Sequence, residues 1–173
     1  MELIDVLDNN GKKIGKVIDK DIAHRDGIWH GAIHLLIISE DRRCILLQKR
    51  CSLKKLFPDM WDVSVGGHIK SRESSLESLN RETEEELGLI VGDLKVKKIK
   101  RIKEEFYYNN IHSCEFVDLY LTYYSGDLSN IKMQEEEVSD VRWFTKEEFN
   151  KLIEKKEVVN HQEEFIIINE LLK

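Results

Sequence analysis

The sequence predicts a single domain of the α/β class, in which strands and helices share one hydrophobic core. The chain has 173 residues, of which 41% are hydrophobic and 35% charged, enough for a globular domain with a sizeable core. Apolar runs of strand length are interspersed with helical patterns. There is no internal repeat, low-complexity linker or second-domain boundary, so we expect one domain over residues 1–173.

The N-terminal third is predicted to form strands. Residues 2–18 alternate weakly and turn at Asn9-Asn10-Gly11, which predicts an N-terminal hairpin within residues 1–20. A short polar segment follows at residues 21–26. Further strands are predicted at residues 29–39, 44–50 and 61–65, the first two paired as a hairpin.

The strongest helical pattern runs from about Ser74 to Leu87. Ser74 and Glu77 have the spacing of a capping box, and Gly88 is a natural C-terminal stop. At about 100° per residue, one stripe is predicted to be buried and a separate arc carries three carboxylates. The stripe consists of Leu76, Leu79, Thr83 and Leu87. The arc consists of Glu82, Glu85 and Glu86.

Three carboxylates on one arc of a helix repel one another and raise one another's pKa values. A hard divalent cation such as Mg²⁺ or Mn²⁺ relieves both problems, because it prefers oxygen ligands. The alternative is an acidic helix face in contact with water. The spacing therefore suggests a metal site without proving one.

The second half of the chain adds strands and two helices. Residues 94–107 begin with a run of lysines and arginines. A nucleic-acid-binding face is one interpretation, but an edge strand protected by lysines is favoured. Strands at 114–124 and 138–144 and a helix at 146–155 follow. The core is thus expected to span residues 28–157, and a C-terminal helix residues 160–173.

The acidic helix belongs to a longer pattern that resembles the signature of the Nudix hydrolases, G-x5-E-x7-R-E-U-x-E-E-x-G-U, where U is a bulky aliphatic residue. The seven fixed positions are all present: Gly67, Glu73, Arg81, Glu82, Glu85, Glu86 and Gly88. Leu89 fits the last position, whereas Thr83 stands where a larger aliphatic residue is usual. A match at seven positions with fixed spacing is a strong signal.

This resemblance implies a Nudix-type α/β/α sandwich with a mixed β-sheet. It also implies an enzyme that cleaves a diphosphate joined to another group, with Mg²⁺ or Mn²⁺ as cofactor. Glu73 and Arg81 are expected to support the site by an ion pair between loop and helix. Glu82 is a candidate base. The implied metal ligands are the Gly67 carbonyl, Glu82, Glu85 and Glu86, and these three glutamates are the implied catalytic residues.

A second resemblance covers more of the chain. Residues 23–34, 46–68 and 114–116 are similar to isopentenyl-diphosphate isomerase and its bacterial Nudix relatives. The isomerase holds one metal with three histidines and two glutamates. The matching second metal site here would consist of His24, His30, His68 and Glu115. Ser113 stands where the other glutamate would be. The alternative is that these histidines are surface or hydrogen-bonding groups.

Position 66 departs from the isomerase pattern. The isomerase needs a cysteine just before the glycine of its Gly-His pair, and this chain has Gly66 there. Glycine has no side chain that can transfer a proton. Because the glutamates of the Nudix signature are intact, the combination favours diphosphate hydrolysis.

Residues 51–60 are predicted to form a basic loop just ahead of the metal site. Arg50, Lys54 and Lys55 are expected to bind substrate phosphate, with ordinary solubility charge as the alternative. Phe57, Trp61 or a tyrosine at 107–108 could stack on a base, although core packing suits Trp61 better. One carboxylate of residues 135–137 is a further candidate for the site. His34 is expected to be a satisfied core residue.

Composition and charge exclude several classes of protein. The net charge of −6 argues against a general nucleic-acid binder. The odd number of cysteines, Cys44, Cys51 and Cys114, indicates free thiols in a reducing compartment. The acidic N-terminus lacks the apolar region of a signal peptide, and no apolar run reaches membrane-spanning length. We therefore expect a cytoplasmic protein without a membrane partner. A homodimer is compatible with the sequence.

Three functions remain in competition at this stage. The leading hypothesis is a metal-dependent pyrophosphohydrolase acting on a small organic diphosphate such as a nucleoside diphosphate derivative. The second is an isopentenyl-diphosphate isomerase, supported by the histidines and weakened by Gly66. The third is a non-catalytic sensor of a diphosphate metabolite, against which the intact glutamates argue.

Overall fold

The computed structural model describes residues 1–173 and begins with the expected hairpin, β1 (Leu3–Leu7) and β2 (Lys13–Asp19). The two strands pair antiparallel in a sheet of their own. The Asp8 carboxylate accepts hydrogen bonds from the backbone N–H groups of Asn10 and Lys12, which stabilises the turn between them.

A short helix, α1 (Lys20–Asp26), follows the hairpin, where the sequence predicted only a polar segment. The Asp19 side chain caps its first turn, and Gly27 ends it in a left-handed conformation with φ of 64°. The prediction missed this helix because seven residues are too few to show helical periodicity.

The remaining seven strands form one mixed sheet. They are β3 (Trp29–Ser39), β4 (Cys44–Arg50), β5 (Trp61–Asp62), β6 (Val65–His68), β7 (Lys97–Tyr108), β8 (Ile111–Tyr124) and β9 (Val138–Thr145). Strand β3 lies at the centre and pairs in parallel with β8 along its whole length. On its other edge β3 pairs antiparallel with β6 and then with the start of β4.

The sheet divides where β4 leaves β3. Only Ile37–Leu46 and Ile38–Ile45 are paired between the two strands, so the predicted hairpin exists only next to its turn. Beyond this point β4 pairs with β9 and β5. Ser64 lies in the gap, accepting from the Ile37 N–H and donating to the Leu46 carbonyl. The single strand expected at residues 61–65 is therefore wrong, because Val63 and Ser64 separate β5 from β6.

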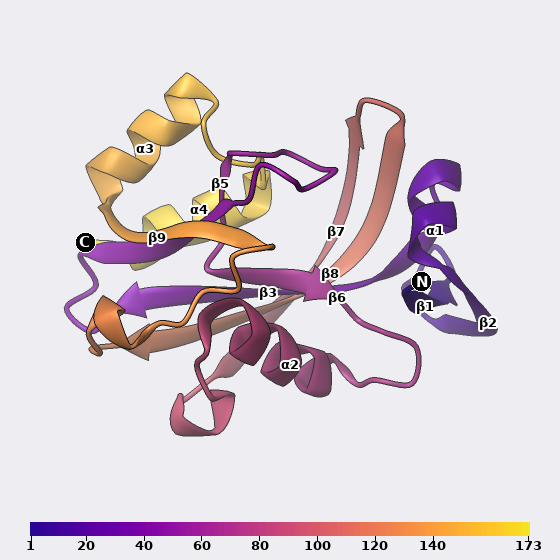
Figure 1. The fold of residues 1–173 in the computed structure, drawn as a ribbon, viewed down its shortest axis with the longest axis horizontal. Coiled ribbons are helices and arrows are strands. Elements are labelled where there is room, and N and C mark those ends of the chain that lie inside the picture. The colour runs from indigo at the N-terminus through magenta and orange to yellow at the C-terminus, as the bar shows by residue number, and fades with distance from the viewer.

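Helices cover both faces of this sheet, as Figure 1 shows, with α2 (Ser75–Leu87) on one side and α3 (Lys146–Lys155) and α4 (Gln162–Leu171) on the other. Two short 3₁₀ segments, η1 (Val91–Asp93) and η2 (Leu128–Asn130), follow α2 and β8. A capping box begins α2 at the expected Ser74, and a second one begins α3 at Thr145. The α/β/α sandwich with a mixed sheet is confirmed.

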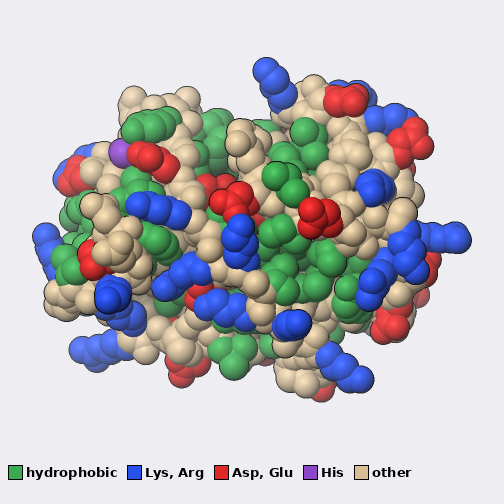
Figure 2. Space-filling view, turned by 180° about the vertical axis from the view of Figure 1, so that it is seen from behind, with side chains coloured by type: hydrophobic (Ala, Val, Ile, Leu, Met, Phe, Trp, Pro, Cys, Tyr) green, Lys and Arg blue, Asp and Glu red, His purple; other side chains and the backbone are tan.

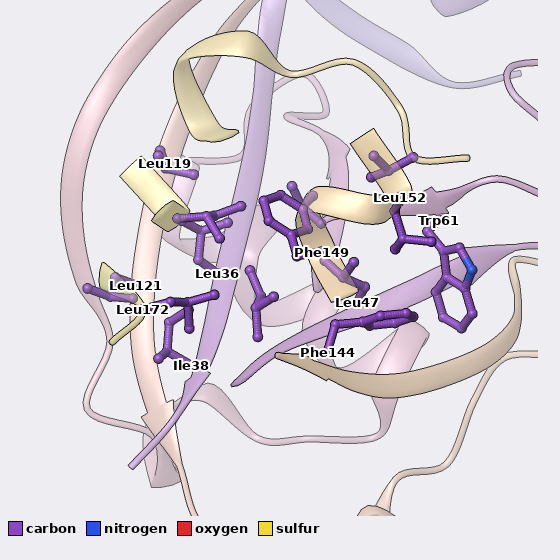
Figure 3. Packing of buried hydrophobic residues seen from close by; sticks show 14 of the residues in the cluster. Leu36, Ile38, Leu47, Trp61, Leu119, Leu121, Phe144, Phe149, Leu152 and Leu172 are labelled. Atoms are coloured by element: carbon purple, nitrogen blue, oxygen red, sulfur yellow. The ribbon is translucent and has the colours of Figure 1, made fainter. Parts of the chain in front are cut away.

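Alternate residues of β3 contribute to two cores, because successive side chains of a strand point to opposite faces. The core on the α2 side includes Ile33, Leu35, Ile37, Leu79 and Leu87. The core on the α3–α4 side, part of which Figure 3 shows, includes Ala32, Leu36, Ile38, Phe149 and Ile168. This double burial holds β3 rigidly beside the site described below.

Two details of α2 differ from the prediction. Leu76 is 52% exposed and does not join the buried stripe. Glu86 is buried, because seven residues after Leu79 it returns to within about 20° of the same direction. The acidic arc and the buried face therefore overlap at one residue.

Strand β7 is the edge strand that its lysines suggested. Lys98 and Arg101 pair with Asp118 of β8, and Lys100 pairs with Glu163. Figure 2 shows basic and acidic side chains interspersed over the face of the molecule opposite to that in Figure 1. All three cysteines are free. None of the helices has the length and apolar character needed to cross a bilayer.

Candidate functional site

A cavity of about 310 Å³ lies between α2, β6, the loop after β4 and the start of α4. Its lining combines carboxylates, basic side chains, imidazoles and two aromatic rings. The charged residues include Glu82, Glu85, Glu86, Arg50, Lys54, His34, His68, Glu115 and His161. Residues from both halves of the chain therefore meet at one hollow.

The backbone at Gly67 approaches the acidic helix closely. A Cβ atom placed on Gly67 would lie 2.2 Å from the Glu82 carboxyl carbon, a contact that real side chains do not make. Any larger residue at position 67 would therefore push the Glu82 carboxylate from its place. The Gly67 backbone therefore lies beside Glu82, and both residues belong to the Nudix signature.

Glu86 is held by two hydrogen bonds at the inner end of the acidic group. The Gln48 side-chain amide donates to its Oε2 at 2.8 Å, and the Gly66 N–H donates to the same oxygen at 3.2 Å. Burial, followed by the charge of Glu82, raises the pKa of Glu86 to about 8. Burial also raises the pKa of Glu82. The charge of Glu82 thus opposes the ionisation of Glu86.

Arg81 links the loop before α2 to the helix. Its guanidinium donates to Glu73 at 2.9 and 3.0 Å and to the His68 carbonyl at 3.1 Å. It also contacts Glu82 at 2.6 Å and Glu85 at 3.3 Å. Arg81 is therefore placed where it can hold loop and helix together, while the effect of that support on activity stays a prediction.

The carboxylate set fits a divalent cation. Glu82 and Glu86 are both largely withdrawn from water. Arg81 beside Glu82 and the charge of Lys54 near Glu86 offset their repulsion only in part, because the pKa of each glutamate is still raised. Oxygen donors of this kind suit Mg²⁺ or Mn²⁺. Glu82, Glu85, Glu86 and the Gly67 carbonyl would hold the ion.

A second group, here called the histidine cluster, consists of His24, His30, His68 and Glu115. One ligand atom from each lies within 4.8 Å of the others. In the sheet, His30 stands directly opposite Glu115, and His68 lies on β6 on the other side of β3. Helix α1, which the sequence did not predict, supplies His24.

The histidine cluster also fits a metal ion, with three nitrogen donors and one carboxylate. The Nε2 atoms of His24 and His30 are buried and have no hydrogen-bond partner. Burial and the charge of His68 lower the pKa of His24 to about 4, so its ring is a neutral donor. Burial alone would lower the pKa of His68, but Glu115 and Glu2 raise it to about 9.

Two of the three basic residues that were expected to bind phosphate line the cavity. Arg50 and Lys54 line the cavity, where Arg50 donates to Asp62 at 2.9 Å and Lys54 pairs with Glu137. Lys55 does not line this cavity but a neighbouring one, to which Arg50 and Lys54 also contribute, and it pairs with Asp21 on α1. Adjacent residues of a loop point in different directions, so sequence alone did not distinguish them.

The aromatic residues that were expected to stack on a base lie in different parts of the molecule. Phe57 lines the cavity with its ring centroid 5.4 Å from Phe106 and 4.5 Å from Tyr108, and its φ of 46° is unusual for a residue other than glycine. Trp61 instead packs in the core against Phe144. Tyr107 is 70% exposed and stacks on His112.

Sequence reasoning missed a group of polar side chains that reaches the wall of the cavity. Its members His34, Asp62 and His161 are buried and line the cavity. Glu164 is buried next to His34, and the half-buried Glu104 contacts His161. One signal was available, because Glu164 precedes Ile168 by four residues and so occupies the apolar face of α4. No fixed spacing could reveal the others, since 99 residues separate Asp62 from His161.

Comparisons with known proteins identify the family of the chain. The NUDIX domain family model matches residues 29–166. Nudix hydrolase 3 of Arabidopsis thaliana is 36% identical over 160 residues, which is 90% of this chain but 21% of that protein. An uncharacterized Nudix hydrolase of Clostridium acetobutylicum is 34% identical over 139 residues, covering 79% of this chain and 66% of the other. The chain thus spans about a fifth and about two thirds of these relatives.

The fold has a close counterpart among solved structures. A crystal structure from Deinococcus radiodurans superposes with a TM-score of 0.77 and 20% identity, over 99% of this chain and 100% of the other. At that identity the likeness shows the fold alone. Since the matched family region runs from β3 into α4 and includes the acidic helix, this chain belongs to the Nudix family.

Proposed function

We propose that the protein is a metal-dependent pyrophosphohydrolase that cleaves a diphosphate joined to a small organic group, such as a nucleoside. One observation carries the proposal. The glutamates of α2 share a single cavity with the basic side chains of Arg50 and Lys54. Such a cavity can hold cations and phosphoryl oxygens side by side, as cleavage of a phosphoanhydride requires.

Each cavity residue has a distinct part in this proposal. Bound Mg²⁺ or Mn²⁺ would neutralise phosphoryl oxygens and lower the pKa of water. Glu82, Glu85 and Glu86 hold the ions, and Gln48 orients Glu86 by its hydrogen bond. Glu82 is the proposed base.

The opposite side of the cavity binds the rest of the substrate. Arg50 and Lys54 contact phosphate, Arg50 in an orientation fixed by its bonds to Asp62 and to the Leu56 carbonyl. Phe57 and Phe106, whose ring centroids lie 5.4 Å apart, both line the cavity and offer apolar surface to the organic group. Glu137 is the one of the three acidic residues 135–137 that lines the cavity.

Replacement of Glu86 by glutamine tests the proposal. Glu86→Gln removes a metal-binding charge and keeps the shape of a side chain that Gln48 and Gly66 contact. We expect an unchanged melting temperature and a loss of Mg²⁺-dependent turnover of about 10³-fold, equivalent to several kcal/mol. Phosphate or pyrophosphate release would be measured over a panel of diphosphate substrates.

Glu84→Gln is the matched control, because Glu84 lies on the same helix, is exposed and does not line the cavity. Its turnover should equal that of the wild type. Full activity in Glu86→Gln would refute the site. Tight binding of diphosphates without any product would instead favour the sensor hypothesis.

An isopentenyl-diphosphate isomerase is the second candidate, favoured by the convergence of the histidine cluster. Gly66 counts against it, because the isomerase pattern has a cysteine at this position and glycine has no side chain that can transfer a proton. Incubation with isopentenyl diphosphate, followed by NMR of the double bond, distinguishes the two. Migration of the double bond would establish the isomerase.

A further inference from the structure

His34 is buried in β3 and is fixed by a partner from the far end of the chain. Its Nδ1 lies 2.6 Å from the Oε1 of Glu164 on α4, and both side chains are more than nine-tenths buried. The ring also packs edge-on against His161, with centroids 4.8 Å apart. The sequence-based expectation of a satisfied core histidine describes only this half of the ring.

The other half of the ring faces the cavity. His34 lines the cavity, and its Nε2 has no hydrogen-bond partner. Because the Glu164 carboxylate accepts from Nδ1, that nitrogen carries a proton, and Nε2 is the atom left for a ligand. Unlike the Nε2 atoms of His24 and His30, this atom is not completely buried, so a molecule in the cavity can reach it.

Glycine at position 66 keeps this edge open. His34 and Gly66 are directly paired between β3 and β6. A Cβ atom on Gly66 would lie 3.1 Å from Cδ2 and 3.4 Å from Nε2 of His34. Any larger residue would therefore cover the edge of the ring that faces the cavity.

Gly66 also connects His34 with the acidic helix. The Gly66 N–H contacts Glu86 at 3.2 Å, so His34 and Glu86 lie against the same residue. A diphosphate held by metal ions at Glu86 would have His34 within reach. Arg50, bonded through Asp62 to His161, adds a further cation to the same wall.

We propose that His34 is a substrate-contacting residue whose Nε2 donates a hydrogen bond to a phosphoryl oxygen, and that Glu164 positions it. This inference rests on the proposed function for the presence of a diphosphate at Glu86. It makes α4 part of the substrate site. The charge on the neighbouring Glu164 raises the pKa of His34 against the effect of burial, which favours a ring with protons on both nitrogens.

A purely structural role is the competing explanation, since the His34–Glu164 pair also ties α4 to the sheet. The variant His34→Asn separates the two. Its amide nitrogen reaches the place of Nδ1 and can still donate to Glu164, but nothing replaces Nε2. His112→Asn is the matched control, because His112 is a partly exposed histidine that does not line the cavity.

The experiment measures the Kd of inorganic pyrophosphate with Mg²⁺ by calorimetry and the melting temperature of each variant. We expect His34→Asn to keep the melting temperature and to weaken pyrophosphate binding about tenfold, as for loss of one charge-assisted hydrogen bond. His112→Asn should bind as the wild type does. Unchanged affinity in a folded His34→Asn, or no pyrophosphate binding by the wild type, would overturn the proposal.

A double-mutant cycle on pyrophosphate binding tests whether Glu164 acts through His34. Glu164→Gln keeps an oxygen that accepts from Nδ1 and removes the charge, so we expect about threefold weaker pyrophosphate binding. In the His34→Asn background the same change should add nothing, because its effect passes through the missing Nε2. Independent losses that add would show that Glu164 does not act through His34.

These results are separable from those on Glu86. If the wild type hydrolyses diphosphates and Glu86→Gln does not, while His34→Asn binds pyrophosphate normally, only the role of His34 is wrong. If His34→Asn weakens binding while Glu86→Gln remains active, the phosphate contact stands and the assignment of the acidic residues falls.

Discussion

The acidic residues of α2 and the histidine cluster meet at strand β6, where Gly67 lies beside Glu82 and His68 belongs to the histidine cluster. The two groups are nevertheless assembled differently. The acidic group comes from one helix within five positions, Glu82 to Glu86. The histidine cluster draws one residue from each of α1, β3, β6 and β8. The first is local in sequence, and the second exists only after the sheet has formed.

The two groups also differ in their electrostatics. In the acidic group, burial and then the like charge of Glu82 raise the pKa of Glu86, and a bound cation would relieve the repulsion. In the histidine cluster, one carboxylate faces three imidazoles, and Glu115 lies 3.6 to 3.7 Å from His30 and His68. Oxygen donors prefer hard ions, and imidazoles suit transition metals. We expect the two sites to select different metals.

The substitution Gly67→Ala would damage the acidic group most directly. A Cβ atom there would collide with the Glu82 carboxylate and displace it by an ångström or more. Displacement of that size corresponds to a loss on the order of 100-fold in kcat/KM. Gly92→Ala is the control, because a Cβ on Gly92 meets its nearest neighbour only at 4.0 Å. Retention of wild-type kinetics by Gly67→Ala would show that Glu82 need not lie where the structure has it.

The substitution His24→Ala tests the independence of the two groups. Removal of one of the nitrogen donors should lower the affinity for Zn²⁺ or Co²⁺ by at least about tenfold. Loss of a residue that only hydrogen-bonds to a metal ligand already lowers metal affinity by about 10- to 100-fold. The Mg²⁺ concentration for half-maximal turnover should not change. Metal titrations by calorimetry and by activity measure the two quantities. If the Kd for Zn²⁺ or Co²⁺ and the Mg²⁺ concentration for half-maximal turnover rose together, the two groups would form one coupled centre.

A smaller effect is expected from the adjacent lysines. Lys54→Ala should raise KM about fivefold, equivalent to about 1 kcal/mol, because Lys54 lines the cavity. Lys55→Ala should change KM by less than twofold, because Lys55 does not line the cavity. Loss of its exposed pair with Asp21 should lower the stability of the fold by only about 0–1 kcal/mol. Steady-state kinetics on the same substrate would show the difference. Equal effects would mean that the loop moves when substrate binds.

The residues that could be placed from sequence are those whose positions depend on short spacing. The capping box of Ser74, the stop at Gly88 and the gathering of three glutamates on α2 follow from helical periodicity, which holds in any tertiary context. The histidine cluster was named from resemblance alone. Its convergence depends on the parallel pairing of β3 with β8, which no local pattern specifies.

Sequence by itself therefore determined the α/β class, the acidic helix and the family. Tertiary structure alone decided that Lys54 and not Lys55 reaches the cavity, that Glu86 is buried, and that Glu164 meets His34 across 130 residues. The physical reason is that hydrogen bonds within a helix fix neighbours three and four residues apart. Contacts between distant segments depend instead on how whole strands and helices pack.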